Sequence, residues 1–378
     1  MKKSKKLKKH KLSQKQRIKN ALRILQESEK LKIEVKLDNK NFNIKPLPVL
    51  WKNKFIFFIQ QWIVPCHFKN WLLRRTGMKV GHDACIPHYI KFDPYFPDLI
   101  YIGAGTLIGG VSKLMTHDIK GNKLILGKII FPEKGMVGGS TIVHPGTELK
   151  KNSILSFYSE FHGGVINEGE IWSGNPAKCI HRMNEEEINK YFKHTSENPK
   201  EYYKRFKKEV RGFLNDPSRT YFKIQYGGKR AGAGNDWWRA RNVLRIFYNG
   251  VIIEITRMLG PSRLKNLLLR MVGVKMGKNC TIGKGTVFDH IYCDNIRLGN
   301  NVRIDENCYL DGHEYTIAQT VFGKTRIGND VHIKHDSYVR TATQIGDNVT
   351  IEPNSFCQRE IPANEVWGGM PAKFIRKK

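Results

Sequence analysis

The chain has 378 residues, 40% of them hydrophobic, so it is long enough for about two domains with buried cores. Lysine and arginine number 65 against 34 acidic residues, a formal charge of +31 that favours either a solvated basic surface or anionic partners such as a membrane. No helix-turn-helix, zinc-finger or RRM signature accompanies the charge, so we expect no nucleic-acid partner. Seven scattered cysteines without a CxxC pair exclude a disulfide framework and a cysteine zinc site.

The first 50 residues form a lysine-rich arm. We expect residues 1–20 to be disordered or frayed and residues 21–35 to be helical. The arm lacks the apolar core of a signal peptide, and no stretch of about 20 apolar residues follows. The sequence therefore predicts a cytoplasmic protein, in which contact with the cytoplasmic face of a membrane stays open.

An apolar, aromatic segment at residues 55–64 precedes the repeats, and a second such segment lies at residues 243–259. Each runs into a basic, leucine-rich piece, at residues 71–75 and 267–270. One interpretation is a helix that covers the open end of a solenoid, because terminal coils must be capped. The other is an interfacial helix lying on a membrane with basic residues facing the headgroups. The two interpretations are compatible.

Between about residues 80 and 180, large apolar residues recur every six positions. They are Ile102, Ile108 and Leu114, followed by Phe131, Val137, Val143, Leu149, Leu155 and Phe161. A period of six fits neither a helix nor a single strand. It fits a coil with three flat faces of six residues each, in which the apolar residue points inward and a small residue four positions later fits at the corner. This pattern predicts a hexapeptide-repeat parallel β-helix.

The same ladder returns near the C-terminus, at Val321, Ile327, Ile333, Val339, Ile345 and Ile351. A shift of 196 places the first ladder on the second and also matches single residues, including His117 with His313 and Asp93 with Asp289. The chain therefore holds two copies of one domain. We expect four segments: the arm at 1–50, a first β-helix domain with its N-terminal helix at 51–183, a helical and glycine-rich linker at 184–235, and a second such domain at 236–378.

The two ladders are interrupted at matching places. One break lies at residues 94–99 and 290–295, and the other follows the matched histidines, at 118–126 and 314–320. Extra residues that leave a coil there predict a protruding loop, and loops on rigid scaffolds often carry binding and chemistry.

The linker at residues 184–235 has no evident counterpart in the other copy. Residues 185–213 are expected to be helical. The glycine-rich stretch at 227–234 predicts a flexible connection.

Both copies end alike, with WSGNPAK at residues 172–178 and WGGMPAK at 367–373. The ladder, the histidine before a loop and this ending resemble the left-handed β-helix O-acetyltransferases, which include galactoside, maltose and polysaccharide acetyltransferases. The resemblance covers the repeat region of each copy and nothing of the arm or the linker. It implies a left-handed coil, acetyl-CoA as co-substrate, a hydroxyl acceptor on a sugar or cell-envelope glycan, and a trimer-like homo-oligomer with sites between subunits.

The resemblance places His117 and His313 at the catalytic position. A neutral histidine suits a general base that takes the proton of an acceptor hydroxyl, because its ordinary pKa lies close to working pH. Asp118 and Glu314 follow directly and would either orient the ring or be solvated loop carboxylates.

The resemblance also implies residues that meet the cofactor and the acceptor. The candidates for the cofactor are Gly138, Gly139 and Ser140 on one coil and the basic residues Lys178, Arg182, Lys373 and Arg376. The coil of the second copy carries bulk and charge at residues 332–336, which favours the first copy as the active one. Asp93 and Asp289 are weaker candidates for binding the acceptor.

Two further functions stay open at this point. A non-catalytic or half-catalytic scaffold would use the solenoids to bind a membrane or a partner. A zinc enzyme of the γ-carbonic anhydrase type would need converging histidines, for which His82 with His88, or His332 with His335, are the available residues. Their spacing does not match that family, so we expect no metal.

Overall fold

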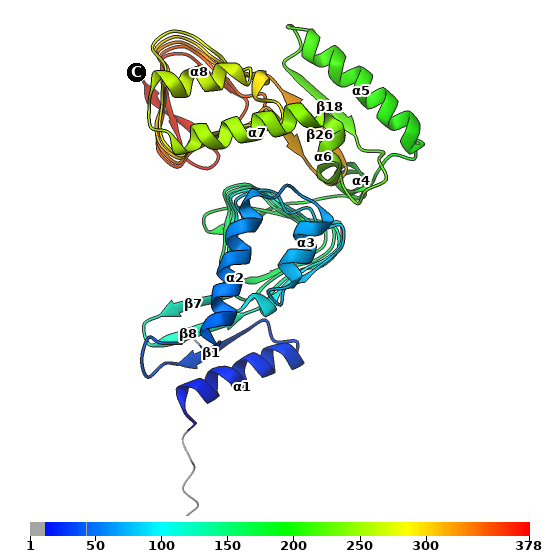
Figure 1. The fold of residues 1–378 in the computed structure, drawn as a ribbon, viewed down its shortest axis with the longest axis vertical. Coiled ribbons are helices and arrows are strands. Elements are labelled where there is room, and N and C mark those ends of the chain that lie inside the picture. Colours follow the sequence, from blue (N-terminus) through cyan, green and yellow to red (C-terminus); the bar gives the residue numbers. More distant parts are fainter. Residues whose placement is uncertain (1–11, 43) are drawn as a thin grey trace, which may run out of the picture. The chain divides into compact units, whose positions relative to one another are not determined.

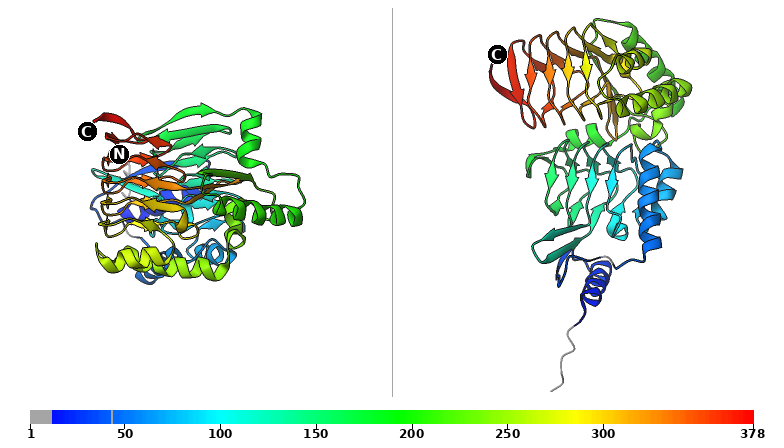
Figure 2. Two further views of the ribbon diagram at one scale, coloured as in Figure 1. Left: turned by 90° about the horizontal axis from the view of Figure 1, so that it is seen from above. Right: turned by 60° about the vertical axis from the view of Figure 1, so that its left-hand side comes forward.

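The computed structural model describes residues 12–42 and 44–378. The chain forms two compact units, Met1–Arg182 and Met183–Lys378. Each unit contains a stack of short strands that run in parallel on three sheets, as the ladders of arrows in Figures 1 and 2 show. Each unit is therefore a three-faced parallel β-helix, the architecture that the six-residue period predicts.

The chain visits the three faces of the first unit in turn. The first face holds β2 (Lys79–Val80), β4 (Ile100–Ile102), β9 (Ile129–Phe131), β12 (Thr147–Leu149) and β15 (Gly164–Ile166). The second face holds β5 (Leu107–Ile108), β10 (Met136–Val137), β13 (Ile154–Leu155), β16 (Glu170–Gly174) and the antiparallel β17 (Ala177–Arg182). The third face holds β3 (Lys91–Phe92), β6 (Lys113–Leu114), β11 (Ile142–Val143) and β14 (Glu160–Phe161).

The second unit repeats this order. Its first face holds β19 (Lys275–Met276), β22 (Ile296–Leu298), β27 (Thr325–Ile327), β30 (Gln344–Ile345) and β33 (Glu360–Ile361). Its second face holds β20 (Thr281–Ile282), β23 (Arg303–Ile304), β28 (His332–Ile333), β31 (Thr350–Ile351), β34 (Glu365–Gly368) and the antiparallel β35 (Lys373–Lys377). Its third face holds β21 (Val287–Phe288), β24 (Tyr309–Leu310), β29 (Tyr338–Val339) and β32 (Phe356–Cys357).

The apolar ladder fills the interior of each coil, as predicted. Val137, Val143 and Leu149 have no exposed surface, and neither do Ile333 and Ile351. The chain turns at corner residues with φ near +55°, most of which are asparagine or aspartate in the second unit, the residues that tolerate this left-handed conformation best after glycine. One ladder residue was placed wrongly: Val321 lies on the hairpin strand Gln319–Gly323, outside the coils, so the unbroken run after the hairpin begins at Ile327.

The break after each matched histidine is an antiparallel hairpin that extends the chain outward from the coil. In the first unit it consists of β7 (His117–Lys120) and β8 (Lys123–Gly127), and in the second of β25 (His313–Tyr315) and β26 (Gln319–Gly323). The other break is a single turn of 3₁₀ helix, η2 (Pro97–Leu99) or η4 (Cys293–Asn295), and does not extend as a loop.

A third strand from an earlier part of the chain completes each hairpin sheet. Strand β1 (Lys32–Lys36) pairs with β8, and β18 (Tyr221–Gln225) pairs with β26 in the same register, since Lys32 faces Gly127 and Tyr221 faces Gly323. A helix precedes each of these strands, α1 (Gln14–Glu27) and α5 (Pro199–Asn215), as Figure 1 shows. The helices pack on the hairpins through apolar residues, among them Leu25 with Leu126 and Phe213 with Phe322.

These elements correct three expectations for the arm and the linker. Residues 21–35 are not one helix: the helix begins earlier, after the Ser13 cap, and a strand follows. The predicted frayed segment 1–20 is helical from Gln14, and residues 1–11 lie outside the described residues. The segment 184–235 does have a counterpart, because α5 and β18 occupy the place of α1 and β1. The shift of 196 does not reveal this correspondence, because β1 and β18 are 189 residues apart.

The rest of the segment 184–235 is folded as well. Helix α4 (Glu185–Phe192) begins with an Asn184–Glu187 capping box, so the expected helical stretch is present in two pieces. The glycine-rich stretch 227–234 is packed instead of flexible: its Ala233 is buried and donates a backbone hydrogen bond to Ile317. The short helices η3 (Ala233–Asp236) and α6 (Trp237–Ala240) lead into the second pre-solenoid pair.

A pair of helices covers the first coil of each solenoid, α2 (Leu47–Ile59) with α3 (His67–Arg74) and α7 (Val243–Met258) with α8 (Arg263–Met271). The short helix η1 (Gln60–Trp62) extends α2. Ile56, Phe57 and Leu73 join the core of the first unit, and Ile253 and Leu269 join that of the second, so these helices act as caps. Within the described residues, no helix combines the length and the apolar character that crossing a bilayer requires.

Candidate active site

The two matched histidines lie at the corner between the third and first faces, where the hairpin leaves the coil. His117 is the first residue of β7, and its Nδ1 donates a very short hydrogen bond to Oδ2 of Asp93, which lies one coil earlier just after β3. In the second unit, Nδ1 of His313 donates to Oδ2 of Asp289 over 2.5 Å. With Nδ1 protonated and held by a carboxylate, Nε2 is the basic nitrogen of the neutral ring.

Each aspartate is buried and held by further hydrogen bonds. Asp93 also accepts from the backbone N–H of Tyr95 and from the N–H and hydroxyl of Thr116. Asp289 accepts from three backbone N–H groups, those of Ile291, Tyr292 and Gly312. Burial alone would raise the pKa of both carboxyls. The histidine and the other donors outweigh burial, so the pKa of Asp93 is lowered and that of Asp289 falls to about 2.

Sequence reasoning missed this role of the aspartates. The two carboxylates have 0% and 1% of their residue surface exposed and face the histidine ring, so this geometry favours positioning of the base. Binding of an acceptor by Asp93 or Asp289 stays a prediction. A signal was present, because the aspartate precedes the histidine by 24 residues in both copies. Only the structure shows that residues 24 positions apart lie at the same corner of successive coils.

The residues directly after the histidines do not orient the rings. A carboxylate oxygen of Asp118 accepts a hydrogen bond from the backbone N–H of Ile119. Glu314 forms a two-pronged ion pair with Arg340, with distances of 2.8 and 2.9 Å. Of the two interpretations for these carboxylates, ring orientation is therefore wrong, and Glu314 is not simply solvated either.

Aromatic rings surround His117. The ring centroids of Phe42, Tyr95 and Phe96 lie 4.8, 5.4 and 5.7 Å from that of the imidazole. The side chain of His117 retains 12% of its surface. Phe42 comes from the N-terminal arm, which the sequence gave no reason to connect with the site. The base is therefore mostly buried among aromatic rings, with a small part of its side chain exposed.

Below His117, the same corner of the first unit carries a second polar group. His144 Nε2 lies 2.8 Å from Oε1 of Glu160, and His162 Nε2 lies 3.9 Å from the same oxygen. The hydrogen bond from His144 lowers the pKa of Glu160 despite partial burial. These three residues are on the two coils that follow the hairpin, at the same corner of the prism as the candidate base.

The predicted cofactor residues lie at other places in the unit. Gly138, Gly139 and Ser140 form the corner between the second and third faces, which is not the corner of His117. Lys178 and Arg182 are exposed on β17, and Lys373 and Arg376 are exposed on β35. A single unit therefore does not bring these candidates together with the histidine.

Gly138 has a structural reason of its own. A Cβ built on it would lie 2.3 Å from the backbone nitrogen of Phe157 on the next coil, so only glycine fits the observed spacing. A Cβ on Gly139 would meet its closest neighbour at 3.2 Å, which is tight but less severe.

The histidines named for a carbonic anhydrase do not converge. His88 Nδ1 contacts the backbone oxygen of Gln61, His332 pairs with Asp305, and His335 pairs with Asp336. Among the described residues, none of these three joins a group of donors suited to a metal ion. The predicted combinations His82 with His88 and His332 with His335 are therefore not formed, and His82 lies instead with His67 and Asp83.

Comparisons with known proteins agree with this picture. Residues 324–359 match the family described as bacterial transferase hexapeptide (six repeats). The putative acetyltransferase YvoF of Bacillus subtilis (strain 168) is 27% identical over 151 residues, which cover 39% of this chain and 88% of that protein. The mitochondrial gamma carbonic anhydrase 2 of Arabidopsis thaliana is 26% identical over 37% of this chain and 54% of its own length.

A solved galactoside acetyltransferase in complex with coenzyme A is also similar, with 20% identity over 35% of this chain and 80% of its own, and a TM-score of 0.28. The family match and the three-faced parallel sheets support a fold of the left-handed β-helix type. The predicted resemblance to hexapeptide-repeat acetyltransferases is confirmed, and with it the class of enzyme, an acyltransferase.

Proposed function

We propose that the protein transfers an acetyl group from acetyl-CoA to a hydroxyl of a sugar or cell-envelope glycan, with His117 as the general base. The observation that carries the proposal is the Asp93–His117 hydrogen bond, which holds Nδ1–H on the carboxylate and leaves Nε2 as the nitrogen that can take a proton. A buried, ionised aspartate also stabilises the imidazolium that forms when the base takes a proton.

In the proposed reaction, Nε2 takes the proton of the acceptor hydroxyl while its oxygen attacks the thioester carbonyl. The new C–O bond forms, the C–S bond breaks, and the thiolate of CoA leaves and recovers the proton. A backbone N–H at a coil corner is the simplest donor for the negative charge on the carbonyl oxygen. A positioned base of this kind contributes on the order of 10²–10⁴-fold to the rate.

The cofactor groove is proposed to lie between copies of the chain. Within one unit, the glycine corner at residues 138–140 and the histidine corner are different edges of the prism, so one unit offers half of each groove. A trimer-like assembly would set one copy's glycine corner beside the next copy's histidine. Lys178 and Arg182 would then approach the phosphates of acetyl-CoA from the exposed β17.

The first unit is proposed to carry the activity and the second to act mainly as a scaffold. Arg340 stands where the first unit has His144, and its ion pair with Glu314 occupies the corner beneath His313. This ion pair is the observation that favours a half-catalytic protein over two equal active sites.

An anionic membrane is proposed as the place of action, on the cytoplasmic side. The outer faces of the capping helices leave large apolar side chains exposed at positions related by the shift of 196. The matched exposed pairs are Leu47 and Val243, Trp51 and Phe247, Phe55 and Val251, Phe68 and Leu264, and Trp71 and Leu267. Basic residues accompany them, for example Arg75, whose guanidinium lies 4.8 Å from the Trp71 ring. Apolar and basic side chains on one helix face are typical of interfacial helices.

The test of the transferase proposal combines binding and turnover on the full chain. Acetyl-CoA at about 100 times its Kd should add about 2.7 kcal/mol to the free energy of unfolding, and labelled acetyl-CoA should acetylate a member of a glycan panel. His117→Ala should abolish most turnover while the stabilisation by acetyl-CoA persists. Unchanged turnover in this variant would remove His117 from the mechanism, and absent stabilisation would favour the scaffold.

A further inference from the structure

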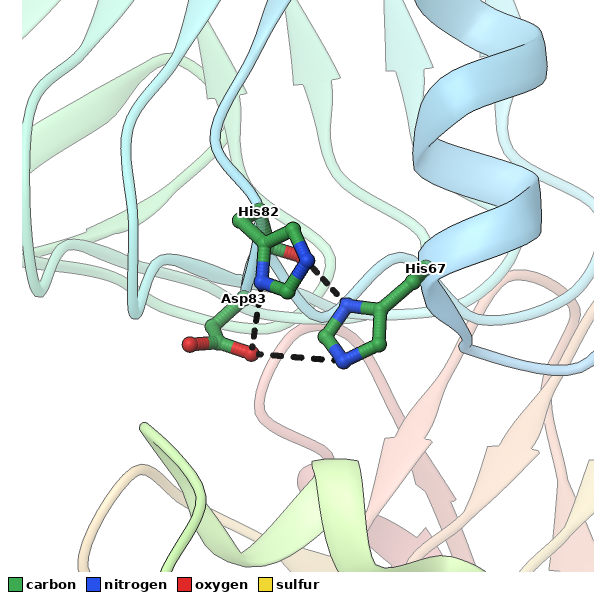
Figure 3. A group of neighbouring side chains, drawn as sticks. All are labelled: His67, His82 and Asp83. Atoms are coloured by element: carbon green, nitrogen blue, oxygen red, sulfur yellow. Dashed lines mark hydrogen bonds and ion pairs between the residues drawn. The ribbon is translucent and has the colours of Figure 1, made fainter.

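A separate group of two histidines and one aspartate lies where the capping helix α3 meets the first coil of the first unit. His67 is the first residue of α3, and His82 and Asp83 follow β2 on the first coil. Figure 3 shows the two rings and the carboxylate turned toward one another. His67 Nε2 lies 3.9 Å and His82 Nδ1 lies 3.6 Å from Oδ1 of Asp83, and the three donor atoms all lie within 4.8 Å of each other.

The backbone around the group fixes both the ring of His67 and the turn that carries the other two residues. Nδ1 of His67 donates a hydrogen bond of 3.0 Å to the backbone oxygen of His82, so Nε2 is the nitrogen that faces Asp83. The side-chain amide of Asn70 donates to the backbone oxygens of Gly81, His82 and Ala84. Histidines that bind metals commonly donate their other ring N–H in this way, which orients the coordinating nitrogen.

The donor set selects a class of ion. Two imidazole nitrogens and one carboxylate oxygen suit Zn²⁺ and its first-row neighbours, whereas Ca²⁺ and Mg²⁺ prefer oxygen alone. With bonds of about 2.0–2.1 Å, a tetrahedral ion needs donors roughly 3.4 Å apart. The two nitrogen–oxygen separations of 3.6 and 3.9 Å exceed this by a few tenths of an ångström. The two imidazole rings stack with their centroids 3.8 Å apart, so one ring must also turn for both nitrogens to face one ion. The side chain of His82 is 70% exposed and has room for these movements.

The second unit supplies an internal comparison. The shift of 196 places Arg263, Lys278 and Asn279 at the three positions, and none of these side chains offers a comparable ligand. The surrounding geometry is nevertheless kept, because Asn266 takes the place of Asn70 and donates to Cys280, the counterpart of Ala84. The fold does not need the three residues, so their presence together in the first unit calls for another reason.

We propose that His67, His82 and Asp83 bind one divalent transition-metal ion of the zinc class, which links the capping helix α3 to the first coil. The site is at the corner between the first and second faces and does not include His117 or Asp93. Three protein ligands leave one position for water, and the exposure of the group gives an ion direct access.

The group of His144, Glu160 and His162 is the other set of metal-type donors among the described residues, and it must be separated in the experiment. That group lies at the corner of the candidate base, so it belongs to the site already described. The variant His144→Ala/His162→Ala removes it and leaves the proposed site intact.

The test titrates Co²⁺ into the metal-free full chain and follows its visible absorption, with Zn²⁺ as competitor. We expect one equivalent that His82→Ala and Asp83→Asn weaken by more than about 10–100-fold, the usual cost of losing even an outer partner of a metal ligand. The His144→Ala/His162→Ala variant should keep this equivalent. Loss of all Co²⁺ binding in that variant, or the same binding in wild type and His82→Ala, would overturn the proposal.

A gain-of-site variant completes the test. Arg263→His/Lys278→His/Asn279→Asp transfers the ligands to the second unit and should add one equivalent of Co²⁺. Because a bound ion stabilises the folded state, Zn²⁺ should also raise the Tm of wild type and leave that of His82→Ala unchanged. A circular dichroism spectrum of each variant shows whether it is folded, so failure to bind is not confused with failure to fold.

Discussion

The two solenoid units share the aspartate–histidine pair and an aromatic ring beside it, Phe96 or Tyr292, but they differ on the coils that follow. In the first unit the coils below the pair present His144 and His162, and in the second they present Arg340 and Gln358. Because the pair recurs while the next two coils differ, the pair by itself does not distinguish the two units. Under the proposed function, the residues on those coils separate the unit that carries the activity from the one that serves as a scaffold.

A partly buried acid contributes to this difference in the second unit. Asp311 stands where the first unit has Met115, and Tyr338 donates a very short hydrogen bond to it. Burial first, and then the charges of Asp289 and Glu314, raise the pKa of Asp311 well above its ordinary value. Together with the Arg340–Glu314 ion pair, this acid gives the second unit a polar network at the corner where the first unit has His144, Glu160 and His162.

The residues at the corner between the second and third faces also differ between the two units. The first unit has Gly138 and Gly139, and the second has Lys334 and His335 at the matching positions. Lys334 pairs with Glu352 at 2.8 Å, so the charge is neutralised within the unit. A groove for an extended cofactor arm is therefore favoured only on the first unit.

Removing each histidine in turn should give the largest difference in activity between the two units. We expect His117→Ala to lower kcat by about 10²–10⁴-fold, whereas His313→Ala should leave most of the activity, because the second unit is proposed to act mainly as a scaffold. Steady-state rates with acetyl-CoA and a reactive acceptor measure both. Equal losses would show that both units are active.

Removing the partner of each base should have a smaller effect of the same kind. Asp93→Asn should lower kcat because the ring loses the carboxylate that orients it, but the loss should stay within that of His117→Ala, since the base itself remains. The pH–rate profile should also shift, because the carboxylate no longer stabilises the imidazolium. Asp289→Asn is the matched control and should leave both the rate and the profile close to wild type.

The spacing of the coils can be tested at the glycine corner of the first unit. Gly138→Ala should lower the free energy of unfolding by about 1–3 kcal/mol, because the added methyl group meets the next coil's backbone. Gly135→Ala is the control, since its Cβ would have nothing within 4 Å. Thermal unfolding followed by circular dichroism compares the two, and equal Tm values would contradict the close approach of the coils.

A buried lysine in each cap should give the smallest difference. Lys69 donates to the backbone oxygens of Ile63 and Pro87, and Lys265 donates to those of Leu259 and Gly283. Burial lowers the pKa of Lys69 to about 7 and that of Lys265 to about 8, from an ordinary value of 10.5.

The unfolded state therefore binds more protons between these values and about pH 10.5, so unfolding free energy should rise with pH there, by at most about 1.4 kcal/mol per pH unit for each group. The rise should begin one pH unit lower for Lys69. Lys69→Met should remove the rise between pH 7 and 8 and should roughly halve the slope between about pH 8 and 10.5, where Lys265 still contributes. Urea unfolding at a series of pH values measures both. An unchanged profile in this variant would show that Lys69 titrates normally.

The apolar ladder and the duplication could be read from the sequence because both depend on local periodicity. A residue every six positions on a regular coil is buried whatever the rest of the chain does. The matched histidines and their hairpins followed from the same alignment. The resemblance carried by the NPAK-type endings then gave the class of enzyme.

The residues that complete the site could not be read in this way, because distant contacts bring them together. Phe42, in the arm, contacts His117 because strand β1 of the arm pairs with the hairpin. The correspondence of β1 with β18 is not visible at the shift of 196, because these strands are 189 residues apart. His67 reaches His82 only because α3 folds back on the first coil. The sequence by itself determined a duplicated, coiled scaffold with a histidine at each break. The tertiary structure was needed to show which carboxylate binds each histidine and which side chains lie beside it. These contacts join residues on different coils, and they depend on how many residues each coil takes.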